Sequence, residues 1–305
     1  RAAALLASRG ADVWAWSRMT DTEVEEGLSW LLDDVPDAVS DMGGELIAGC
    51  VERGLGPAAA LEGTTSGLHR LNGLDVPFPV FNWNDIPLKD RIHNRHHVGL
   101  AAWPAFTAVT GMALHGRSVL VVGFGPVGRG VALVARALGA VVSVAELDPV
   151  RALEAQHHGC RDVLLEEGLA NASIVVTATG IEGVLGPDQL ARLRSGTVLV
   201  NVGHSNREID VGWLDLQPHD GIVPGIDRYV IDGSDVYLLN RGSLVNLAPQ
   251  GESVVGEFFD PFAAIILSGL AWILNGGAEG ASPCLQEYPA HLEKEIAELV
   301  RQARA

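Results

Sequence analysis

A glycine-rich turn holds the residues of this chain that are best suited to binding a charged ligand. Gly123, Gly125 and Gly128 occur in the spacing G-x-G-x-x-G, with Pro126 and Val127 inside it. In such a turn the first glycine allows a tight bend, the second lets the backbone touch a pyrophosphate, and the third lets a helix pack closely on a strand. The following helix would point its positive end at the phosphates. The spacing predicts phosphate binding; a glycine-rich connection without a ligand is the simpler alternative.

The elements around the turn decide between these two interpretations. An apolar run at 119–122 predicts a strand that leads into the turn, and the residues from Val131 to Leu138 are helix-like. A second apolar run at 141–145 ends in Glu146. An acid at this place accepts hydrogen bonds from both hydroxyls of an adenosine ribose and repels a 2′-phosphate. Strand, helix, strand and acid in this order predict a dinucleotide-binding domain that takes NAD rather than NADP.

Size, charge and cysteine content limit the class of protein. At 305 residues, the chain should hold about two domains. A net charge of −17 argues against nucleic acid and against an anionic membrane surface as partners, since both need basic residues. The three cysteines are scattered, with no C-x-x-C, which argues against structural zinc and against a disulfide framework. The sequence shows no signal peptide and no apolar run long enough to cross a membrane, so we expect a cytoplasmic protein.

Apolar runs and helical patterns alternate along most of the chain, which predicts parallel sheets in an α/β fold. The pattern opens mid-helix at Arg1, so we expect a preceding piece to be missing. A helix should begin near Asp21 with Thr22 as its N-cap and Glu25 three residues on. The other expected helices cover 2–8, 96–114, 261–273 and 289–303. The other expected strands cover 12–16, 38–41, 79–82, 173–177, 198–202 and 222–224.

Several short blocks resemble the adenosylhomocysteinase (S-adenosyl-L-homocysteine hydrolase) family. They occur in the order of that family over nearly the whole chain, and the Asn-x-Gly-His and Leu-Val-Asn-Leu blocks are the most specific. The blocks are Ala15-Trp16 with Thr20-Asp21, Asp41-Met-Gly-Gly-Glu45, Thr64-Thr-Ser-Gly-Leu-His69, Asn84-Asp85 with Lys89 and Asn94, the turn from Gly123 to Gly130, Glu146-Leu-Asp-Pro149, Thr177-Ala-Thr-Gly180, Asn201-Val-Gly-His-Ser205 with Glu208-Ile-Asp210, and Leu244-Val-Asn-Leu247.

The resemblance implies a fold and a reaction. It implies two Rossmann-like domains on doubly wound parallel sheets, with an NAD domain at 93–252 inserted into a substrate domain at 1–92 and 253–305. The family holds NAD tightly and uses it to oxidise the 3′-hydroxyl of a nucleoside. The ketone acidifies the C4′ proton, the group on C5′ is expelled, water adds, and the hydride returns to C3′. The implied partners are a small-molecule nucleoside and further copies of the chain, in a dimer or tetramer.

The resemblance also assigns roles to individual residues. It places Lys89 at the sugar 3′-oxygen, where a desolvated lysine can act as acid or base. A surface lysine after Pro87 is the plain alternative. The resemblance places Asn94 and Asn246 at the nicotinamide, and His204 follows a strand, where α/β sheets hold their ligands. The remaining implied cofactor contacts are Thr64, Thr65, Ser66, Thr179, Gly180, Val202 and Gly203.

Among the positions that depart from the pattern of the family, three bear on the residues expected to do chemistry. Met42 stands where the family has a catalytic aspartate, and Gly63 stands where a glutamate holds the ribose hydroxyls. Glu62 is adjacent, and a shift by one residue would let it substitute. His93 replaces a second aspartate beside the 3′-oxygen and can still act as an acid or base near neutral pH. Glu62 and His93 therefore join Lys89 and His204 as catalytic candidates.

Three histidines in the same segment could suggest a metal site. His93, His96 and His97 would share one face of a helix at metal-ligand spacing. Arg91 and Arg95 lie beside them and oppose a cation. A group of site and packing histidines is the better interpretation, and we expect no metal.

An intact cofactor half and an altered substrate half lead to one main hypothesis. The chain would oxidise a nucleoside 3′-hydroxyl, eliminate the 5′-type substituent and return the hydride without adding water. It would be a nucleoside dehydratase or lyase, as in the biosynthesis of nucleoside natural products. Three alternatives stay open: a true adenosylhomocysteinase, an NAD-dependent dehydrogenase of a polyol or carbocyclic nucleoside, and a non-catalytic NAD-binding regulator.

Overall fold

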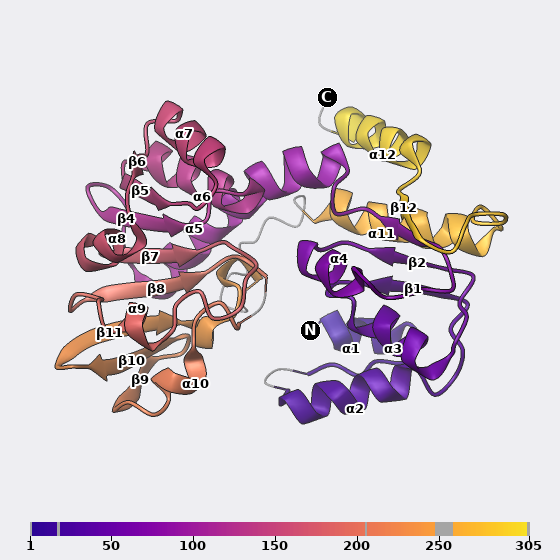
Figure 1. Cartoon of the computed structure of the whole chain (residues 1–305), viewed down its shortest axis with the longest axis horizontal. Coiled ribbons are helices and arrows are strands. Elements are labelled where there is room, and N and C mark those ends of the chain that lie inside the picture. Colours follow the sequence, from indigo (N-terminus) through magenta and orange to yellow (C-terminus); the bar gives the residue numbers. More distant parts are fainter. Residues whose placement is uncertain (1, 17–18, 205, 248–258, 304–305) are drawn as a thin grey trace. The chain divides into compact units, whose positions relative to one another are not determined.

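The chain folds as two compact units, and most of their elements are labelled in Figure 1. The computed structural model describes residues 2–16, 19–204, 206–247 and 259–303. The first unit comprises Arg1–Ile86 and Ala263–Ala305, and the second comprises Pro87–Phe262. The division falls before Pro87 rather than at the expected residue 92, so Lys89 belongs to the second unit. The other expected boundary, at 252–253, lies outside the described residues.

The first unit contains a four-stranded parallel sheet with the order β1-β2-β3-β12. Its strands are β1 (Ala38–Asp41), β2 (Ala59–Glu62), β3 (Val80–Asn82) and β12 (Leu285–Glu287). Because β12 pairs in parallel with β3, the two ends of the chain share one sheet and the second unit is an insertion between them. Helices α1 (Ala2–Ser8), α2 (Asp21–Leu31), α3 (Glu45–Arg53), α4 (Thr65–Leu71), α12 (Ala290–Ala303) and most of α11 (Asp260–Leu274) belong to this unit.

Two sequence-based predictions at the start of the first unit are wrong. Residues 12–16 do not form a strand; instead, the indole N–H of Trp14 donates to the carbonyl oxygen of Glu23 at 3.0 Å. Side-chain packing on α2 thus replaces the backbone ladder that a strand needs. The N-cap of α2 is Thr20 rather than Thr22, because Thr20 and Glu23 form a reciprocal capping box.

The second unit contains an eight-stranded sheet with the order β6-β5-β4-β7-β8-β11-β10-β9. The first six strands in this order, β6, β5, β4, β7, β8 and β11, are parallel. Their order reverses at β4, as in a dinucleotide-binding fold. An antiparallel edge of β10 and β9 follows. The strands are β4 (Ser118–Val122), β5 (Val141–Ala145), β6 (Arg161–Asp162), β7 (Ile174–Thr177), β8 (Thr197–Asn201), β9 (His219–Val223), β10 (Ile226–Ile231) and β11 (Ser234–Leu239).

Helices cover both faces of this second sheet. Along β4, Val119 and Val121 join one buried apolar cluster while Leu120 and Val122 join another, because successive side chains point to opposite faces. The predicted α/β fold with parallel sheets is confirmed. The helices are α5 (Val98–Thr110), α6 (Pro126–Ala137), α7 (Pro149–His157), α8 (Leu165–Asn171), α9 (Pro187–Leu190) and α10 (Val211–Leu214), with short 3₁₀ turns at Asn240–Gly242 and Val245–Leu247.

A π-helix precedes α5, where the sequence predicted a helix only from residue 96. It covers Leu88–His97. Its wider turn brings side chains five residues apart together, as in the ion pair of Asp90 with Arg95 at 3.0 Å. An α-helix would turn these side chains away from each other. π-Helical turns occur often at functional sites.

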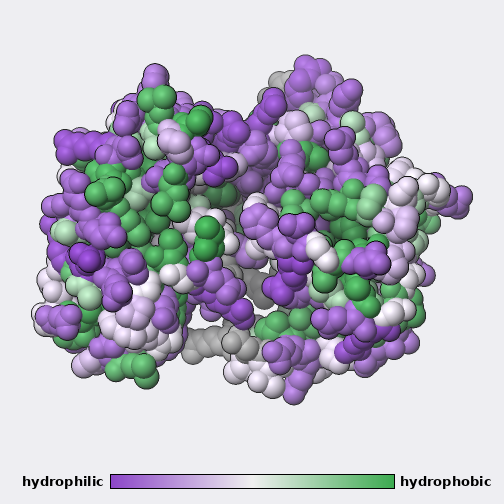
Figure 2. All heavy atoms as spheres, viewed as in Figure 1, coloured by the Kyte–Doolittle hydropathy of each residue, from purple (hydrophilic) through white to green (hydrophobic). Residues whose placement is uncertain are grey.

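The described helices include none that is both long and apolar enough to cross a membrane. Figure 2 shows hydrophilic side chains across much of the visible face, with smaller hydrophobic patches between them.

Candidate active site

The second unit builds its glycine-rich turn at the carboxyl end of β4. Gly123 has a φ of +90°, which glycine adopts without strain. A Cβ on Gly128 would overlap the carbonyl oxygen of Gly123, so only glycine lets α6 begin this close to the strand. Around Gly125, apart from chain neighbours, the nearest described atom to where a Cβ would stand is a guanidinium nitrogen at 3.9 Å. Pro126 opens α6, and Val127 packs on the apolar core. This cradle fits a pyrophosphate.

Glu146 lies beside this turn, just after β5. Its Oε2 accepts a hydrogen bond from the backbone N–H of Phe124 at 2.6 Å. Its Oε1 accepts from the backbone N–H groups of Leu147 at 2.8 Å and Asp148 at 2.9 Å. Oε2, which accepts a single backbone bond, keeps acceptor capacity for a ligand hydroxyl. The acid is therefore held in place by the backbone before any ribose arrives.

One buried carboxylate joins the loops that follow β7 and β8. Glu208 is 1% exposed. It accepts from the backbone N–H of Thr179 at 3.0 Å and of Gly180 at 2.8 Å, and from the Thr179 hydroxyl at 2.9 Å. The backbone N–H of His204 donates to it at 3.2 Å. A Cβ on Gly203 would overlap the carboxylate, so glycine is needed there. The structure thus brings four expected site residues together around one acid.

Sequence reasoning gave Glu208 no role in the site. It lies in the block Glu208-Ile-Asp210 that supported the family resemblance, and this position was the only available signal. An acid in a loop is usually exposed, so its burial could not be read from the local pattern.

Two asparagines organise the end of β8 and the segment after β11. Asn201 accepts from the backbone N–H of Gly203 at 2.9 Å and donates to the carbonyl oxygen of Gly242 at 2.8 Å. Val202, between Asn201 and Gly203, is buried. Asn246 is 7% exposed, and its Oδ1 has no hydrogen-bond partner among the described residues. A buried acceptor without a donor costs free energy, so an amide N–H of a ligand would stabilise it.

The π-helix supplies a buried amine with an altered pKa. Lys89 is 8% exposed, and its Nζ donates to Oδ1 of Asn94 at 2.7 Å. The same Nζ lies 5.3 Å from the ring centroid of Phe262. Burial lowers the pKa of Lys89 from 10.5 to about 8, and the charge of Asp90 opposes this shift. The second unit therefore holds an amine that is partly neutral near physiological pH.

His93 lies one turn further along the π-helix, in an aromatic cluster. Its ring centroid is 5.0 Å from that of Phe262 and 5.9 Å from those of Phe259 and His97. Phe262 thus borders both Lys89 and His93. Among the described residues, no group of three or more His, Cys, Asp or Glu side chains is arranged to hold a metal ion.

Close packing through glycine fixes the π-helix to the nucleotide-binding helix. A Cβ on Gly130 of α6 would overlap the backbone carbonyl of Arg95, and a Cβ on Gly99 would overlap that of Gly130. The absence of both side chains lets the two backbones touch. The helix that carries Lys89 and Asn94 is therefore held against the helix that begins at the glycine-rich turn.

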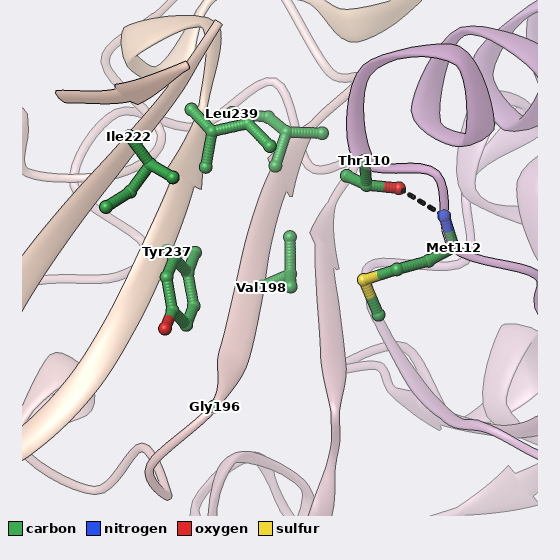
Figure 3. Close-up of a pocket in the computed structure, with 8 residues that line it drawn as sticks. Thr110, Met112, Gly196, Val198, Ile222, Tyr237 and Leu239 are labelled. Atoms are coloured by element: carbon green, nitrogen blue, oxygen red, sulfur yellow. Dashed lines mark hydrogen bonds between the residues drawn. The ribbon is translucent and has the colours of Figure 1, made fainter.

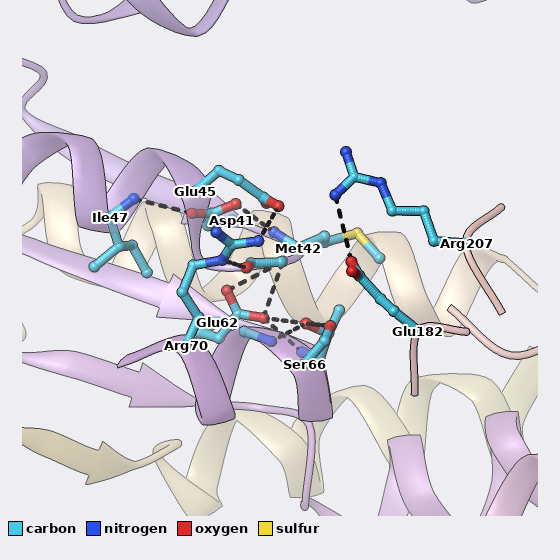
Figure 4. Close-up of polar contacts among 12 residues, drawn as sticks. Asp41, Met42, Glu45, Ile47, Glu62, Ser66, Arg70, Glu182 and Arg207 are labelled. Atoms are coloured by element: carbon cyan, nitrogen blue, oxygen red, sulfur yellow. Dashed lines mark hydrogen bonds and ion pairs between the residues drawn. The ribbon is translucent and has the colours of Figure 1, made fainter. Parts of the chain in front are cut away.

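In the first unit, two buried carboxylates hold the loop after β1 (Figure 4). Asp41 accepts from the backbone N–H of Met42 at 2.7 Å and of Ile47 at 2.9 Å. Glu62 is 0% exposed and accepts from the backbone N–H and the hydroxyl of Thr64, both at 2.7 Å. Burial raises the pKa of both acids, and the charge of Asp41 raises that of Glu62 further.

Comparison with known proteins identifies the family. Residues 104–251 match "S-adenosyl-L-homocysteine hydrolase, NAD binding domain". The S-inosyl-L-homocysteine hydrolase of Methanopyrus kandleri is 33% identical over 97% of this chain and 72% of its own length. The adenosylhomocysteinase of Thermotoga maritima is 33% identical over 96% of this chain and 75% of its own length. The chain belongs to the S-adenosyl-L-homocysteine hydrolase family. The predicted resemblance and the predicted NAD cofactor are confirmed.

Other family members extend beyond the region that this chain covers. The S-inosyl-L-homocysteine hydrolase of Methanocaldococcus jannaschii is 34% identical over 81% of this chain, and the match spans 62% of the length of that protein.

Gly63 departs from the S-adenosyl-L-homocysteine hydrolase pattern, and a neighbouring side chain fills the space beside it. The indole of Trp83, which is 0% exposed, fills the place where a side chain at residue 63 would begin. Glu62 faces a buried network instead, and Gly67 leaves room for its carboxylate. The expectation that Glu62 replaces the lost glutamate stays a prediction, and its burial and its bonds to Thr64 argue against it.

The other departure, Met42, lies on a loop with a fixed backbone. The Met42 side chain is 48% exposed. The carbonyl oxygen of Gly43 accepts from Nε of Arg70 at 2.8 Å, and Arg70 also pairs with Glu45 at 2.6 Å. These contacts hold the loop while leaving the thioether at the surface of the unit.

Three hydroxyl residues of the S-adenosyl-L-homocysteine hydrolase pattern lie at the start of α4, namely Thr64, Thr65 and Ser66. Thr64 is the N-cap of α4, and its hydroxyl accepts from the backbone N–H of Gly67 at 2.9 Å. Ser66 lies 3.2 Å from the Thr64 hydroxyl. Thr65 is exposed and accepts from the side-chain amide of Asn84 at 3.2 Å. The Thr64 hydroxyl is therefore used by the fold, whereas Thr65 is exposed.

A separate apolar pocket lies on the second sheet (Figure 3). Among the described residues that line it, Thr110 and Tyr237 carry the only side-chain hydroxyls, and none carries a charge. The Thr110 hydroxyl is engaged by the backbone N–H of Met112 at 3.1 Å. The lining residues are Thr110, Met112, Gly196, Val198, Ile222, Ile226, Tyr237 and Leu239. The described lining is therefore mainly apolar.

Proposed function

We propose that the chain is an NAD-dependent enzyme that transiently oxidises the 3′-hydroxyl of a nucleoside and eliminates the substituent on C5′ without adding water. The observation that carries this proposal is Lys89, a buried amine with a pKa of about 8 whose Nζ is oriented by Asn94. A hydroxyl becomes easy to oxidise when its proton is removed as hydride leaves the same carbon. An amine base with a pKa near the working pH suits that proton transfer.

The elimination follows from the ketone. Lys89 takes the proton of the 3′-hydroxyl. NAD held at the glycine-rich turn would supply the reversible hydride acceptor for C3′. The ketone makes the proton on C4′ acidic. When that proton leaves, the electron pair forms the C4′–C5′ double bond, and the C5′ substituent departs with its bonding pair and gains a proton. The net change is loss of H–X from the nucleoside, with no net use of NAD.

The first unit supports elimination without hydration. Adding water to the double bond needs a group that takes a proton from the water. Met42 has a thioether where the family has an aspartate, and the ring of Trp83 fills the space beside Gly63. Asp41 and Glu62 already accept backbone hydrogen bonds inside the unit. None of these features supplies an exposed carboxylate.

A hydrolase is the second candidate. Its support is the match to S-inosyl-L-homocysteine hydrolase and adenosylhomocysteinase, two proteins named for their action on a homocysteine nucleoside. If hydration persists, another group must replace the missing carboxylates.

One experiment separates the candidates. The purified protein, loaded with NAD, is incubated with adenosine, inosine, S-adenosylhomocysteine or S-inosylhomocysteine, and products are identified by mass spectrometry while thiol and NADH are followed by absorbance. The proposal expects a nucleoside alkene, with little NADH at completion. A hydrated nucleoside with an equal amount of homocysteine would favour the hydrolase. Absence of any 3′-keto species or alkene from all four substrates would refute the proposal.

A variant makes the distinction sharper. Met42→Asp restores a carboxylate on an exposed loop position, and we expect it to raise the hydrated fraction of the product. Met19→Asp is a matched control in the same unit, because it adds the same charge outside the loop after β1.

A further inference from the structure

Two arginines lie near the glycine-rich turn, and they differ in their contacts. Arg129, in α6, pairs with Glu154 and lies 3.0 Å from Nε2 of His158. Arg151, in α7, places Nη1 3.9 Å from the point where a Cβ of Gly125 would stand. Within the described part of the chain, the Arg151 guanidinium makes no hydrogen bond or ion pair. Arg129 is thus engaged within the protein, whereas Arg151 lies over the turn with its donors available.

The start of α7 fixes where Arg151 lies. Asp148 is the N-cap, and its Oδ1 accepts from the backbone N–H of Val150 at 2.8 Å and of Arg151 at 3.1 Å. Pro149 at the first helical position restricts the backbone further. The Arg151 side chain therefore starts from a rigid point beside Gly125.

The positive charge of Arg151 would offset the acidic residues near the turn. The chain carries a net charge of −17, and Glu146 and Asp148 lie next to the turn. A dinucleotide brings two negatively charged phosphates close to these acidic residues. The partial positive charge of a helix N-terminus is modest. A guanidinium adds a full charge and a planar set of donors that matches phosphate oxygens.

We propose that Arg151 binds the pyrophosphate of NAD from the α7 side of the glycine-rich turn that follows β4. It is a cofactor-binding residue outside the G-x-G-x-x-G spacing. Glu146 repels a 2′-phosphate, so Arg151 serves the pyrophosphate and does not convert the site to NADP. The inference concerns the cofactor alone and is independent of the reaction proposed above.

The test is a binding measurement on the full chain freed of nucleotide. Calorimetry would give the affinities of wild type and Arg151→Ala for NAD, ADP-ribose, NADP and adenosine. We expect Arg151→Ala to weaken NAD and ADP-ribose by about tenfold or more at low salt, as for a charged hydrogen bond, and to leave adenosine unchanged. Arg151→Lys should recover part of the loss. The defect should shrink as salt increases.

A control and three outcomes decide the matter. Arg192→Ala removes an equal charge from an exposed site on the same unit, and should change affinity by less than about twofold, as expected for a screened distant charge. Unchanged NAD and ADP-ribose affinity in Arg151→Ala would overturn the proposal. An equal loss for adenosine would mean that the arginine stacks on the base instead. A larger loss for NADP than for NAD would mean that it reads a 2′-phosphate, which also contradicts the proposal.

Discussion

The two units use their polar groups in opposite ways. In the second unit, Glu146 and Asn246 keep hydrogen-bonding capacity toward a ligand, and the turn at Gly125 leaves space above the backbone. In the first unit, Asp41 and Glu62 point inward and bind the backbone of their own loops. Cofactor binding thus depends on backbone shape that few substitutions preserve. The exposed side chains of the first unit can change while the buried acids keep its fold.

The largest effect that would test this contrast comes from Lys89. Lys89→Ala removes the only buried amine described in the second unit, and we expect kcat to fall by about 10²- to 10⁴-fold, as for loss of a general acid or base. NAD affinity should remain close to wild type, because the glycine-rich turn is untouched. The matched control is Lys294→Ala on the exposed face of α12. Product formation at the wild-type rate would show that the amine has no chemical role.

The pH dependence follows from the same residue. The amine acts as a base only when neutral, so kcat/KM should rise with pH through about 8. The folded pKa of about 8 lies below the ordinary 10.5, so the folded state is penalised while Lys89 is charged. The free energy of unfolding should therefore gain a contribution as pH rises from about 8 toward 10.5. A rate profile that is flat across this range would contradict the assigned pKa.

Glu208 should have the next largest effect. Glu208→Ala leaves the backbone N–H groups of Thr179, Gly180 and His204 without their acceptor, at a cost on the order of 2–5 kcal/mol of unfolding free energy. Glu208→Gln keeps one acceptor oxygen and should cost less. Urea unfolding and NAD titration would measure both consequences. Equal stability of wild type and the alanine variant would show that the two loops are held by other contacts.

A smaller effect should come from the pair of Gly63 and Trp83. Gly63→Glu would force the new side chain against the buried indole, and we expect a loss of about 1–3 kcal/mol, as for overpacking. Trp83→Ala opens that space, so Gly63→Glu should cost less in its presence. A double-mutant cycle followed by thermal unfolding measures this coupling. Additive effects of the two changes would mean that the indole does not exclude a side chain at position 63.

The sequence predicts some elements of the fold well and misses others. The apolar runs at 119–122, 141–145, 173–177 and 198–202 predicted β4, β5, β7 and β8 closely, because strands buried on both faces need continuous apolar residues. The β10–β11 hairpin was not predicted. The strand expected at 12–16 fails because its aromatic residues pack on a neighbouring helix, a contact that local alternation does not encode.

The sequence by itself determined the glycine-rich turn, the acid after β5 and the family, because backbone conformation and short spacings are local properties. Only the tertiary structure decided which polar groups turn inward and which remain available. It made Glu208 the centre of two loops, placed Trp83 beside Gly63, and lowered the pKa of Lys89 through burial. These outcomes depend on desolvation and on contacts between residues far apart in the chain, and no local pattern carries that information.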